Sequence, residues 1–392
     1  MGNEIPVGFD AKRAFHNDRG IGNYSRRFIG AFASQMATTP MFLYTPKYKE
    51  PHAYGKKVVQ NPFLKIEVPH GPLNNALGGA LWRSRRMVRD LKRDGIGIYY
   101  GLSNELPSGI GSLPLKKVVI IHDLIFLRYP DMYPWLDRQF YRRKTRQACE
   151  IADLILTPSG QSKDDVVEFY GVDSDKIEVV HPPCAEVFYE PTTPAKWEAV
   201  RAKYQLPEKY FLSVGAIVER KNLLGVVKAM VELVQKGEDA HLVVVGKAPG
   251  RSKGYLQEIN SLISEVGLED RIHFRDQVPN SDLPVILQHA TSLLFPSFFE
   301  GFGMPIVEAL ASHTPVITSR GGCFPEAGGP GAVYIDPKQP IAMANAMRTL
   351  LHHSKKREEL ITAGWEHAQQ FRLKEMGLRI REIHESLLNP NP

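Results

Sequence analysis

Two glutamates stand eight residues apart in the glycine-punctuated stretch LLFPSFFEGFGMPIVEALASHTPVIT (293–318). A strand is predicted to end at Ser297, and Pro305 stands where a helix would begin, because proline suits the first helical turn. Two helical turns would separate Glu300 from Glu308 by roughly 12 Å, which is comparable to the length of the pyrophosphate region of a nucleotide sugar. One carboxylate could therefore accept hydrogen bonds from the sugar at one end, and the other from the ribose. The alternative is a capping Glu300 and a solvated Glu308. Free amides at the helix N-terminus would attract an anion, and they belong to Gly301, Phe302, Gly303 and Met304.

Adjacent cations follow another predicted strand in FLSVGAIVERKNL (211–223). The strand would end at Gly215, and Arg220 and Lys221 precede a helix that Asn222 can cap. A guanidinium fork beside a compact ammonium suits a diphosphate. The alternative is a solvated basic turn.

His122 ends the predicted strand KVVIIHD (117–123), followed by Asp123. Such a histidine can contact a reacting group, although a lone histidine at a strand end is more often a hydrogen-bonded structural group. The tripeptide Asp173-Ser174-Asp175 has the form of a metal-binding motif, but its setting, FYGVDSDKI, is typical of a turn. We therefore expect no metal site and no cofactor.

The elements that must position these residues alternate along the chain. Apolar strands separated by helices indicate parallel sheets covered on both faces. Strands are predicted at 5–11, 96–101, 117–123, 153–159, 176–183, 210–215, 241–246, 271–274, 292–297 and 315–319. Helices are predicted at 21–36, 79–93, 135–150, 160–170, 222–235, 254–266, 281–290 and 303–312, with a helical tail from 339.

The proline-rich stretch 181–197 suggests an interdomain hinge without a regular element. We therefore expect an α/β protein of two doubly wound, Rossmann-like domains, 1–185 and 195–370, with a deep cleft between them. Ligands bind beyond the carboxyl ends of the strands in such sheets.

Length and composition agree with this organisation. The chain has 392 residues, 43% of them hydrophobic and 23% charged, which excludes a disordered chain or a fibre. Three dispersed cysteines form neither a disulfide framework nor a zinc motif. The apolar runs are too short to span a bilayer, and no signal peptide is evident at the start. We expect a cytoplasmic protein.

The motif EGFGMPIVE, the basic pair and the stretch GFDAKRAFHNDRGIGNYSRRF (8–28) together resemble the retaining GT-B glycosyltransferases of group 1, family 4, over nearly the whole chain. The resemblance implies that Glu308 binds the nucleotide ribose, that Glu300 and His122 contact the transferred sugar, and that Arg220 and Lys221 hold the diphosphate. It further implies a tail, 371–392, that packs on the N-terminal domain, and a loop facing the diphosphate that contains Gly20 and Gly22. A nicotinamide site is disfavoured, because Gly20-Ile21-Gly22 is only half of the dinucleotide fingerprint.

The implied function is transfer of a hexose from a nucleotide sugar, with GDP-mannose the first choice, to a glycan or lipid-linked acceptor. The alternatives are a sugar phosphorylase or sugar-phosphate synthase on the same fold, and a non-catalytic subunit that binds nucleotide sugars. UDP-glucose and UDP-N-acetylglucosamine also remain open as donors.

The charge of +6 is modest, but cations are concentrated in WRSRRMVRDLKRD (82–94) and DRQFYRRKTR (137–146). A cationic helix with aromatic flanks can lie on an anionic membrane surface, and 82–94 is the predicted contact. The alternative is a solvated helical face. No recognition motif for nucleic acid accompanies the charge.

Overall fold

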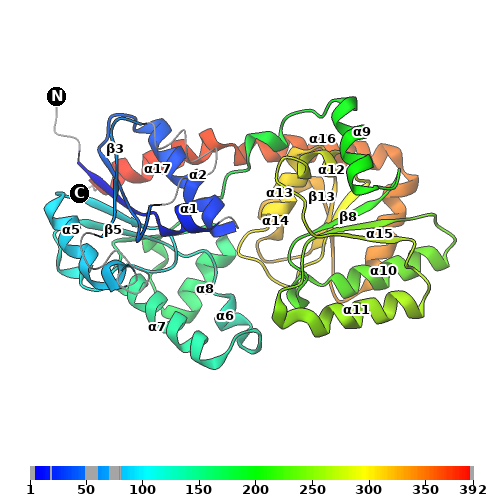
Figure 1. Ribbon diagram of the computed structural model, residues 1–392, viewed down its shortest axis with the longest axis horizontal. Helices are drawn as coiled ribbons and strands as arrows, with labels where there is room; N and C mark the ends of the chain where they lie inside the picture. Colours follow the sequence, from blue (N-terminus) through cyan, green and yellow to red (C-terminus); the bar gives the residue numbers. More distant parts are fainter. Residues whose placement is uncertain (1–4, 18–19, 49–60, 70–78, 80, 389–392) are drawn as a thin grey trace. The chain divides into compact units, whose positions relative to one another are not determined.

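The computed structural model describes residues 5–17, 20–48, 61–69, 79 and 81–388, with only the backbone at 84–85. The chain divides into two compact units (Figure 1). The first comprises 1–183 and 373–392, and the second comprises 184–372.

In the described part of the first unit, seven parallel strands form one sheet in the order β3-β2-β1-β4-β5-β6-β7. Val7 of β1 pairs with Met41 of β2 on one side and with Ile98 of β4 on the other. The strands are β1 (Val7–Asp10), β2 (Met41–Tyr44), β3 (Leu64–Glu67), β4 (Ile98–Gly101), β5 (Lys116–Ile120), β6 (Leu154–Thr157) and β7 (Ile177–Val179).

Helices cover both faces of this sheet. Because successive side chains of a strand point to opposite faces, alternate residues are buried in different cores. Ile98 and Tyr100 pack with residues of α2 and α17, whereas Tyr99 between them packs with residues of α5. The helices are α1 (Lys12–His16), α2 (Gly20–Gln35), α5 (Met87–Arg93), α6 (Ile125–Arg128), α7 (Trp135–Ile151), α8 (Gly160–Tyr170) and α17 (Leu373–Leu388).

The C-terminal helix α17 packs closely on α2. A side chain at Gly377 would come within 2.9 Å of Gln35 and 3.2 Å of the Ala31 carbonyl oxygen. His384 of α17 is buried, and its Nδ1 lies 3.2 Å from the hydroxyl of Tyr100 in the sheet. The last helix is thus part of the core of the first unit.

The described second unit contains a parallel sheet of six strands in the order β10-β9-β8-β11-β12-β13. These strands are β8 (Phe211–Val214), β9 (Leu242–Val245), β10 (Ile272–Arg275), β11 (Ser292–Phe295), β12 (Val316–Ser319) and β13 (Ala332–Ile335). The helices around them are α9 (Pro194–Tyr204), α10 (Leu223–Gln235), α11 (Lys253–Glu265), α12 (Leu283–Gln288), α13 (Met304–Ala311), α14 (Phe324–Gly328), α15 (Pro340–His352) and α16 (Ser354–Ala368).

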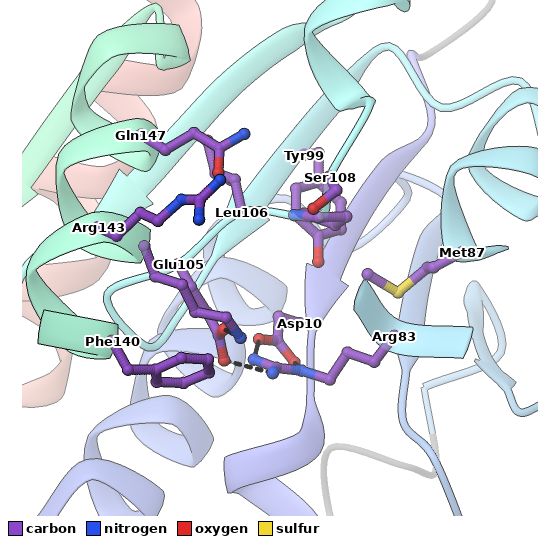
Figure 2. A pocket seen from close by; sticks show the side chains of 12 residues that line it. Asp10, Arg83, Met87, Tyr99, Glu105, Leu106, Ser108, Phe140, Arg143 and Gln147 are labelled. Atoms are coloured by element: carbon purple, nitrogen blue, oxygen red, sulfur yellow. Dashed lines mark hydrogen bonds and ion pairs between the residues drawn. The ribbon is translucent and has the colours of Figure 1, made fainter. Parts of the chain in front are cut away.

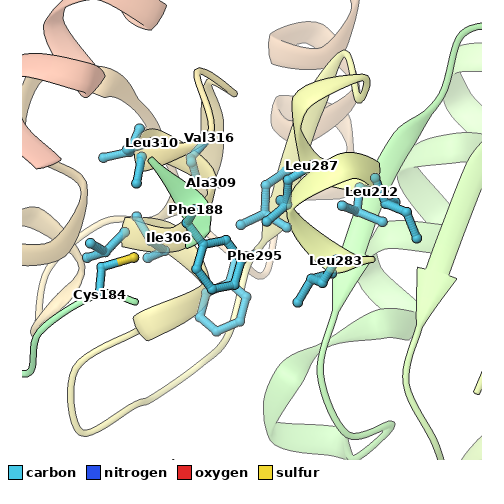
Figure 3. Packing of buried hydrophobic residues seen from close by; sticks show 14 of the residues in the cluster. Cys184, Phe188, Leu212, Leu283, Leu287, Phe295, Ile306, Ala309, Leu310 and Val316 are labelled. Atoms are coloured by element: carbon cyan, nitrogen blue, oxygen red, sulfur yellow. The ribbon is translucent and has the colours of Figure 1, made fainter. Parts of the chain in front are cut away.

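This sheet also has two cores. Leu212, Leu293 and Phe295 face the core beneath α12 and α13 (Figure 3). Leu294, between two of them in sequence, packs instead with residues of α10 and α11. The continuous apolar strands of the sequence therefore reflect burial on both faces.

The fold class and the ten predicted strands are confirmed, but three strands were missed. β2 and β13 are four-residue strands, and β3 is a partly exposed edge strand, LKIE, with little apolar pattern. The stretch 181–197 contains a regular element after all, because α9 begins at Pro194 and Thr193 caps it. Proline at the first helical position starts a helix rather than preventing one.

Candidate functional site

Arg220 and Lys221 both pair with the carboxylate of Glu300. Nη1 of Arg220 lies 2.7 Å from Oε1 of Glu300, and Nζ of Lys221 donates to the same oxygen at 2.9 Å. The three side chains are only 13–18% exposed. Burial would raise the pKa of Glu300, but the charges and hydrogen bonds of Lys221 and Arg220 outweigh it and lower the pKa to about 2. The group therefore carries two positive charges and one negative charge, so it attracts anions.

A short turn between β8 and α10 positions the two cations. Glu219–Lys221 forms one 3₁₀ turn, and the left-handed Asn222 (φ 57°) ends it. Asn222 also caps α10 as predicted, since its side-chain oxygen accepts from the Gly225 amide at 3.2 Å. Its side-chain nitrogen donates to the Pro337 carbonyl at 2.7 Å, which ties the turn to another loop of the unit.

The absence of a side chain at Gly215 leaves room for Lys221. A Cβ there would come within 3.0–3.1 Å of the outer atoms of the Lys221 side chain, and the φ of +137° itself favours glycine. Nζ of Lys221 also lies 4.5 Å from the centre of the Phe295 ring. Gly246 is required too, because a Cβ would come within 1.8 Å of the Gly215 carbonyl oxygen. Sequence reasoning identified Gly215 but assigned no role to Gly246.

The second glutamate lies on the helix that follows this group. α13 begins at Met304, with the left-handed Gly303 (φ 110°) as its N-cap and Pro305 in its first turn. Glu308 is half-buried on α13. The side chain of Phe302 is buried against Phe371, so it belongs to the core of the unit.

Two residues beside Glu300 were missed by the sequence reasoning. Sγ of buried Cys323 donates to the Glu300 carbonyl at 3.2 Å, which helps to fix the backbone of that residue. The hydroxyl of Ser297 is buried and has no hydrogen-bond partner among the described residues. Ser297 was considered only as a strand end, because one serine in a sequence carries no sign of its burial.

His122 lies in the first unit, just after β5, and is 8% exposed. Its Nε2 lies 2.9 Å from the carbonyl oxygen of Leu102, so Nε2 carries the proton and Nδ1 is left as an acceptor. Burial lowers the pKa of His122 to about 4, although the Leu102 bond acts the other way. The imidazole is therefore neutral at physiological pH. The ring of Tyr24 packs edge-on against it, with ring centres 4.8 Å apart.

Asn104 holds the backbone on both sides of this histidine. Its side-chain oxygen accepts from the His122 amide at 2.8 Å, and its side-chain nitrogen donates to the Asp123 carbonyl at 3.4 Å. Asn104 is left-handed (φ 58°), a conformation that asparagine tolerates better than most residues. Sequence reasoning did not select Asn104, because its partner is 18 residues away.

The two N-terminal glycines lie in the first turn of α2, not in a loop. A Cβ on Gly22 would come within 1.7 Å of the Asn17 carbonyl oxygen, whereas Gly20 faces open space. The helix start needs glycine at 22 because it packs against the backbone that follows α1. Contact of either glycine with a diphosphate remains a prediction.

Arg83 joins the ends of two strands in the first unit. Its guanidinium pairs with Asp10 at the end of β1 and with Glu105 after β4 (Figure 2). Lys144 of α7 donates to Glu105 at 2.7 Å. Arg83 lies in a π-helical turn, Trp82–Arg86, that precedes α5. Burial would raise the pKa of Glu105, but Arg83 and Lys144 lower it.

Contact of 82–94 with a membrane stays a prediction, but not every residue of this segment is available for it. Trp82 is buried and donates to Asp90 at 2.6 Å, and Arg83 is in the ion pairs described above. Arg93 is exposed but pairs with Glu67 and with acidic residues of its own segment. The sequence of a basic helix does not show which of its cations pair with carboxylates from distant parts of the chain.

The aspartate pair at 173–175 forms a turn. The Asp173 carboxylate accepts from the Asp175 amide at 3.0 Å and starts the 3₁₀ turn Ser174–Lys176. Across the described residues, no group of three His, Cys, Asp or Glu side chains is arranged to hold a metal ion. None of the described helices combines the length and the apolar character that crossing a membrane requires.

Two family models together match most of the chain. The model described as Glycosyl transferases group 1 matches residues 197–367, and the model described as Glycosyltransferase Family 4 matches residues 19–184. The chain belongs to this family of retaining glycosyltransferases, which have the GT-B fold.

Two named relatives have the same sequence identity to this chain, 29%. The chain is 29% identical to O-antigen chain mannosyltransferase B of Escherichia coli over 276 residues, 70% of each chain. It is also 29% identical to D-inositol 3-phosphate glycosyltransferase of Corynebacterium glutamicum over 304 residues, 75% of this chain and 72% of the relative.

Solved structures match the fold over nearly the full length. A glycosyltransferase from Rickettsia africae superposes with a TM-score of 0.75 and 16% identity, covering 99% of this chain and 100% of that one. Sucrose-phosphate synthase from Thermosynechococcus elongatus superposes with a TM-score of 0.75 and 19% identity, and the match covers 99% of this chain and 100% of that one. Anabaena Alr3699/HepE, solved in complex with UDP-glucose, superposes with a TM-score of 0.74 and 17% identity, and the match covers 98% of this chain and 100% of that one.

Proposed function

We propose that this glycosyltransferase transfers a hexose, mannose from GDP-mannose in the first place, to a glycan or lipid-linked acceptor. The observation that carries the donor assignment is the group of Arg220, Lys221 and Glu300, which is largely shielded from solvent and positive overall. A relative named as a mannosyltransferase favours mannose. UDP-glucose remains the main alternative, since a structural neighbour was solved with it.

Within this proposal the diphosphate binds to Arg220, Lys221 and the amides at the start of α13, Gly301 to Met304. The two cations already lie side by side on one oxygen of Glu300, so they can also neutralise adjacent phosphate oxygens. Glu308 accepts hydrogen bonds from the ribose, and Glu300 accepts them from the sugar. Because the cations lower the pKa of Glu300, this carboxylate is always available as an acceptor.

We propose that retention proceeds by attack on the same face from which the diphosphate departs. A double displacement needs a carboxylate nucleophile beneath the anomeric carbon, and we assign Glu300 to hydroxyl binding instead. The leaving phosphate oxygen takes the proton of the acceptor hydroxyl, while Arg220 and Lys221 stabilise the charge that develops on it. Neutral His122 accepts a hydrogen bond from a sugar hydroxyl at Nδ1, the nitrogen that Leu102 leaves unprotonated.

The reaction in this proposal needs no metal, because the basic pair supplies the charge that a bound cation would provide. We also propose a cytoplasmic enzyme, since all three cysteines are buried and none of them forms a disulfide. Peripheral attachment to anionic membranes is supported by exposed cations, Arg86 just before α5 and Arg89 and Lys92 on it. The exposed side chains of Trp135 and Leu136 at the start of α7 also support it.

A thermal-shift screen of nucleotide sugars tests the donor. A ligand present at about 100 times its Kd stabilises the fold by about 2.7 kcal/mol, so the true donor should stand out against the other nucleotides. Proton NMR of the first-formed product then tests the stereochemistry, and an inverted anomer would overturn the mechanism. A phosphorylase would consume phosphate, and a non-catalytic subunit would bind the donor without turnover.

A further inference from the structure

A cavity of about 810 Å³ opens in the first unit beside the carboxyl ends of β1 and β4. Five cations line it: Lys12, Arg13, Lys47, Arg83 and Lys144. Two carboxylates, Glu105 and Asp123, also line it, and Asp10 pairs with Arg83 from the adjoining pocket. Positive charge is therefore in excess even after these ion pairs are counted.

Lys12 and Arg13 on α1 contribute to this excess, together with Lys47. Arg83 and Lys144 are neutralised by Asp10 and Glu105, whereas Lys12 lies near the cations Arg83 and Arg13 as well as near these two carboxylates. Partial burial lowers the pKa of Lys12, and the charges of Arg83 and Arg13 lower it further. Cations that crowd one another at a cavity wall are stabilised when an anion binds between them.

Four aromatic residues also line the cavity, Phe126, Tyr133, Phe140 and Tyr141. Phe126 and Tyr133 contact each other with ring centres 6.4 Å apart, and Phe126 and Tyr141 are 5.9 Å apart. Phe140 adds a ring beneath the ammonium of Lys144, at 4.6 Å. Phe140 and Tyr141 are 57% and 44% exposed, which leaves large apolar surfaces open to a ligand.

We propose that this cavity binds the acceptor through a phosphate group, with Lys12 and Arg13 on the phosphate and the four aromatic residues against the group esterified to it. This inference rests on the proposed transferase function and specifies its acceptor as a phosphorylated one. Both a lipid-linked glycan and a soluble sugar phosphate carry this group.

The cavity lies next to His122, the residue of the first unit that is assigned to the reaction. Asn104 and Asp123 line it, and Asn104 also holds the His122 backbone. Arg13 is close enough to His122 for its charge to contribute to the low pKa of the histidine. A phosphate on Lys12 and Arg13 would therefore place the attached sugar beside His122, where the acceptor hydroxyl must react.

Calorimetric titration tests the cavity without any donor present. The probes are inorganic pyrophosphate, geranyl diphosphate, glucose 6-phosphate and, as uncharged controls, geraniol and glucose. The variant Lys12→Ala/Arg13→Ala should weaken phosphate binding at least about tenfold, because two charged hydrogen-bond donors are lost. Lys116→Ala is the matched control, since it removes an exposed cation of the same unit that does not line the cavity. Lys221→Met identifies any binding at the donor site.

Tighter binding of geranyl diphosphate than of pyrophosphate, reduced by Tyr141→Ala, would identify a lipid-linked acceptor. Preference for glucose 6-phosphate would identify a soluble one, and either result supports the proposal. The proposal would be overturned if phosphate binding were lost in Lys221→Met but unchanged in Lys12→Ala/Arg13→Ala. It would also be overturned if glucose and glucose 6-phosphate bound with equal affinity, or if none of the phosphate probes bound. Because no donor is used, a failure of the transferase assignment would not affect these measurements.

Discussion

Replacing Lys221 by methionine separates the structural part of the basic group from its catalytic part. Methionine keeps much of the length and apolar contact of the stem but removes the ammonium that lies 2.9 Å from Glu300. Arg220 remains 2.7 Å from the same carboxylate, so the variant retains one of the two ion pairs. We expect it to fold with a moderate loss of stability and a large loss of turnover.

The size of the stability loss follows from the pKa of Glu300, which is lowered from 4.5 to about 2. That difference corresponds to about 3 kcal/mol of stabilisation of the ionised fold. Two cations share it. Because this is a net value that already includes the opposing effect of burial, half of it is a lower bound for Lys221. Losing Lys221 should therefore cost at least about 1–2 kcal/mol, or roughly 2–8 °C in Tm for a unit of this size. A lowered carboxyl pKa stabilises above pH 4.5, so the difference should be full at neutral pH and shrink as the pH falls from 4.5 toward 2.

The loss of turnover should be larger, about 10²-fold or more, as for other lost donors to a developing oxyanion. Chemical denaturation and steady-state kinetics with the donor found by the screen measure the two effects on one preparation. Lys228→Met, an exposed lysine on α10, is the matched control and should change neither. Near wild-type turnover in Lys221→Met would refute the diphosphate assignment, whatever its stability.

Four further outcomes are expected. Activity should survive EDTA, and complete loss that magnesium or manganese restores would contradict the metal-free mechanism. His122→Ala should lower kcat strongly while nucleoside diphosphate affinity stays nearly unchanged; equal losses in both would mean that His122 is only structural. Because burial lowers the pKa of His122 to about 4, the pH–rate profile should show no step from this residue near 6.5, and a step abolished by His122→Ala would contradict its neutrality. Sedimentation with anionic vesicles should fall with added salt and in Trp135→Ser/Leu136→Ser, whereas absence of binding to anionic and neutral vesicles alike would show that these residues are only solvated.

The sequence was most informative where one segment contains the whole signal. Continuous apolar runs predicted β8, β9 and β11, because a strand buried on both faces must be apolar throughout. The cap at Asn222 and the helix start at Pro305 were also predictable, since capping depends on residues within one turn. β2 and β13 are apolar runs of the same four-residue length and were nevertheless missed.

Tertiary structure decided what depends on residues far apart in the chain. Arg83 looked like one cation of a surface helix, yet it pairs with Asp10, 73 residues away, and with Glu105. Gly246 gained its role from the backbone of Gly215, which packs against it.

The sequence by itself determined the family, the two parallel sheets and the residue types able to bind a diphosphate, because these follow from local pattern. Only the tertiary structure showed that Arg220 and Lys221 share one oxygen of Glu300, 79 residues away. It also showed that burial keeps His122 neutral. Ionisation and charge balance depend on solvent exclusion and on distances between side chains, and both are fixed only when the strands assemble into a sheet.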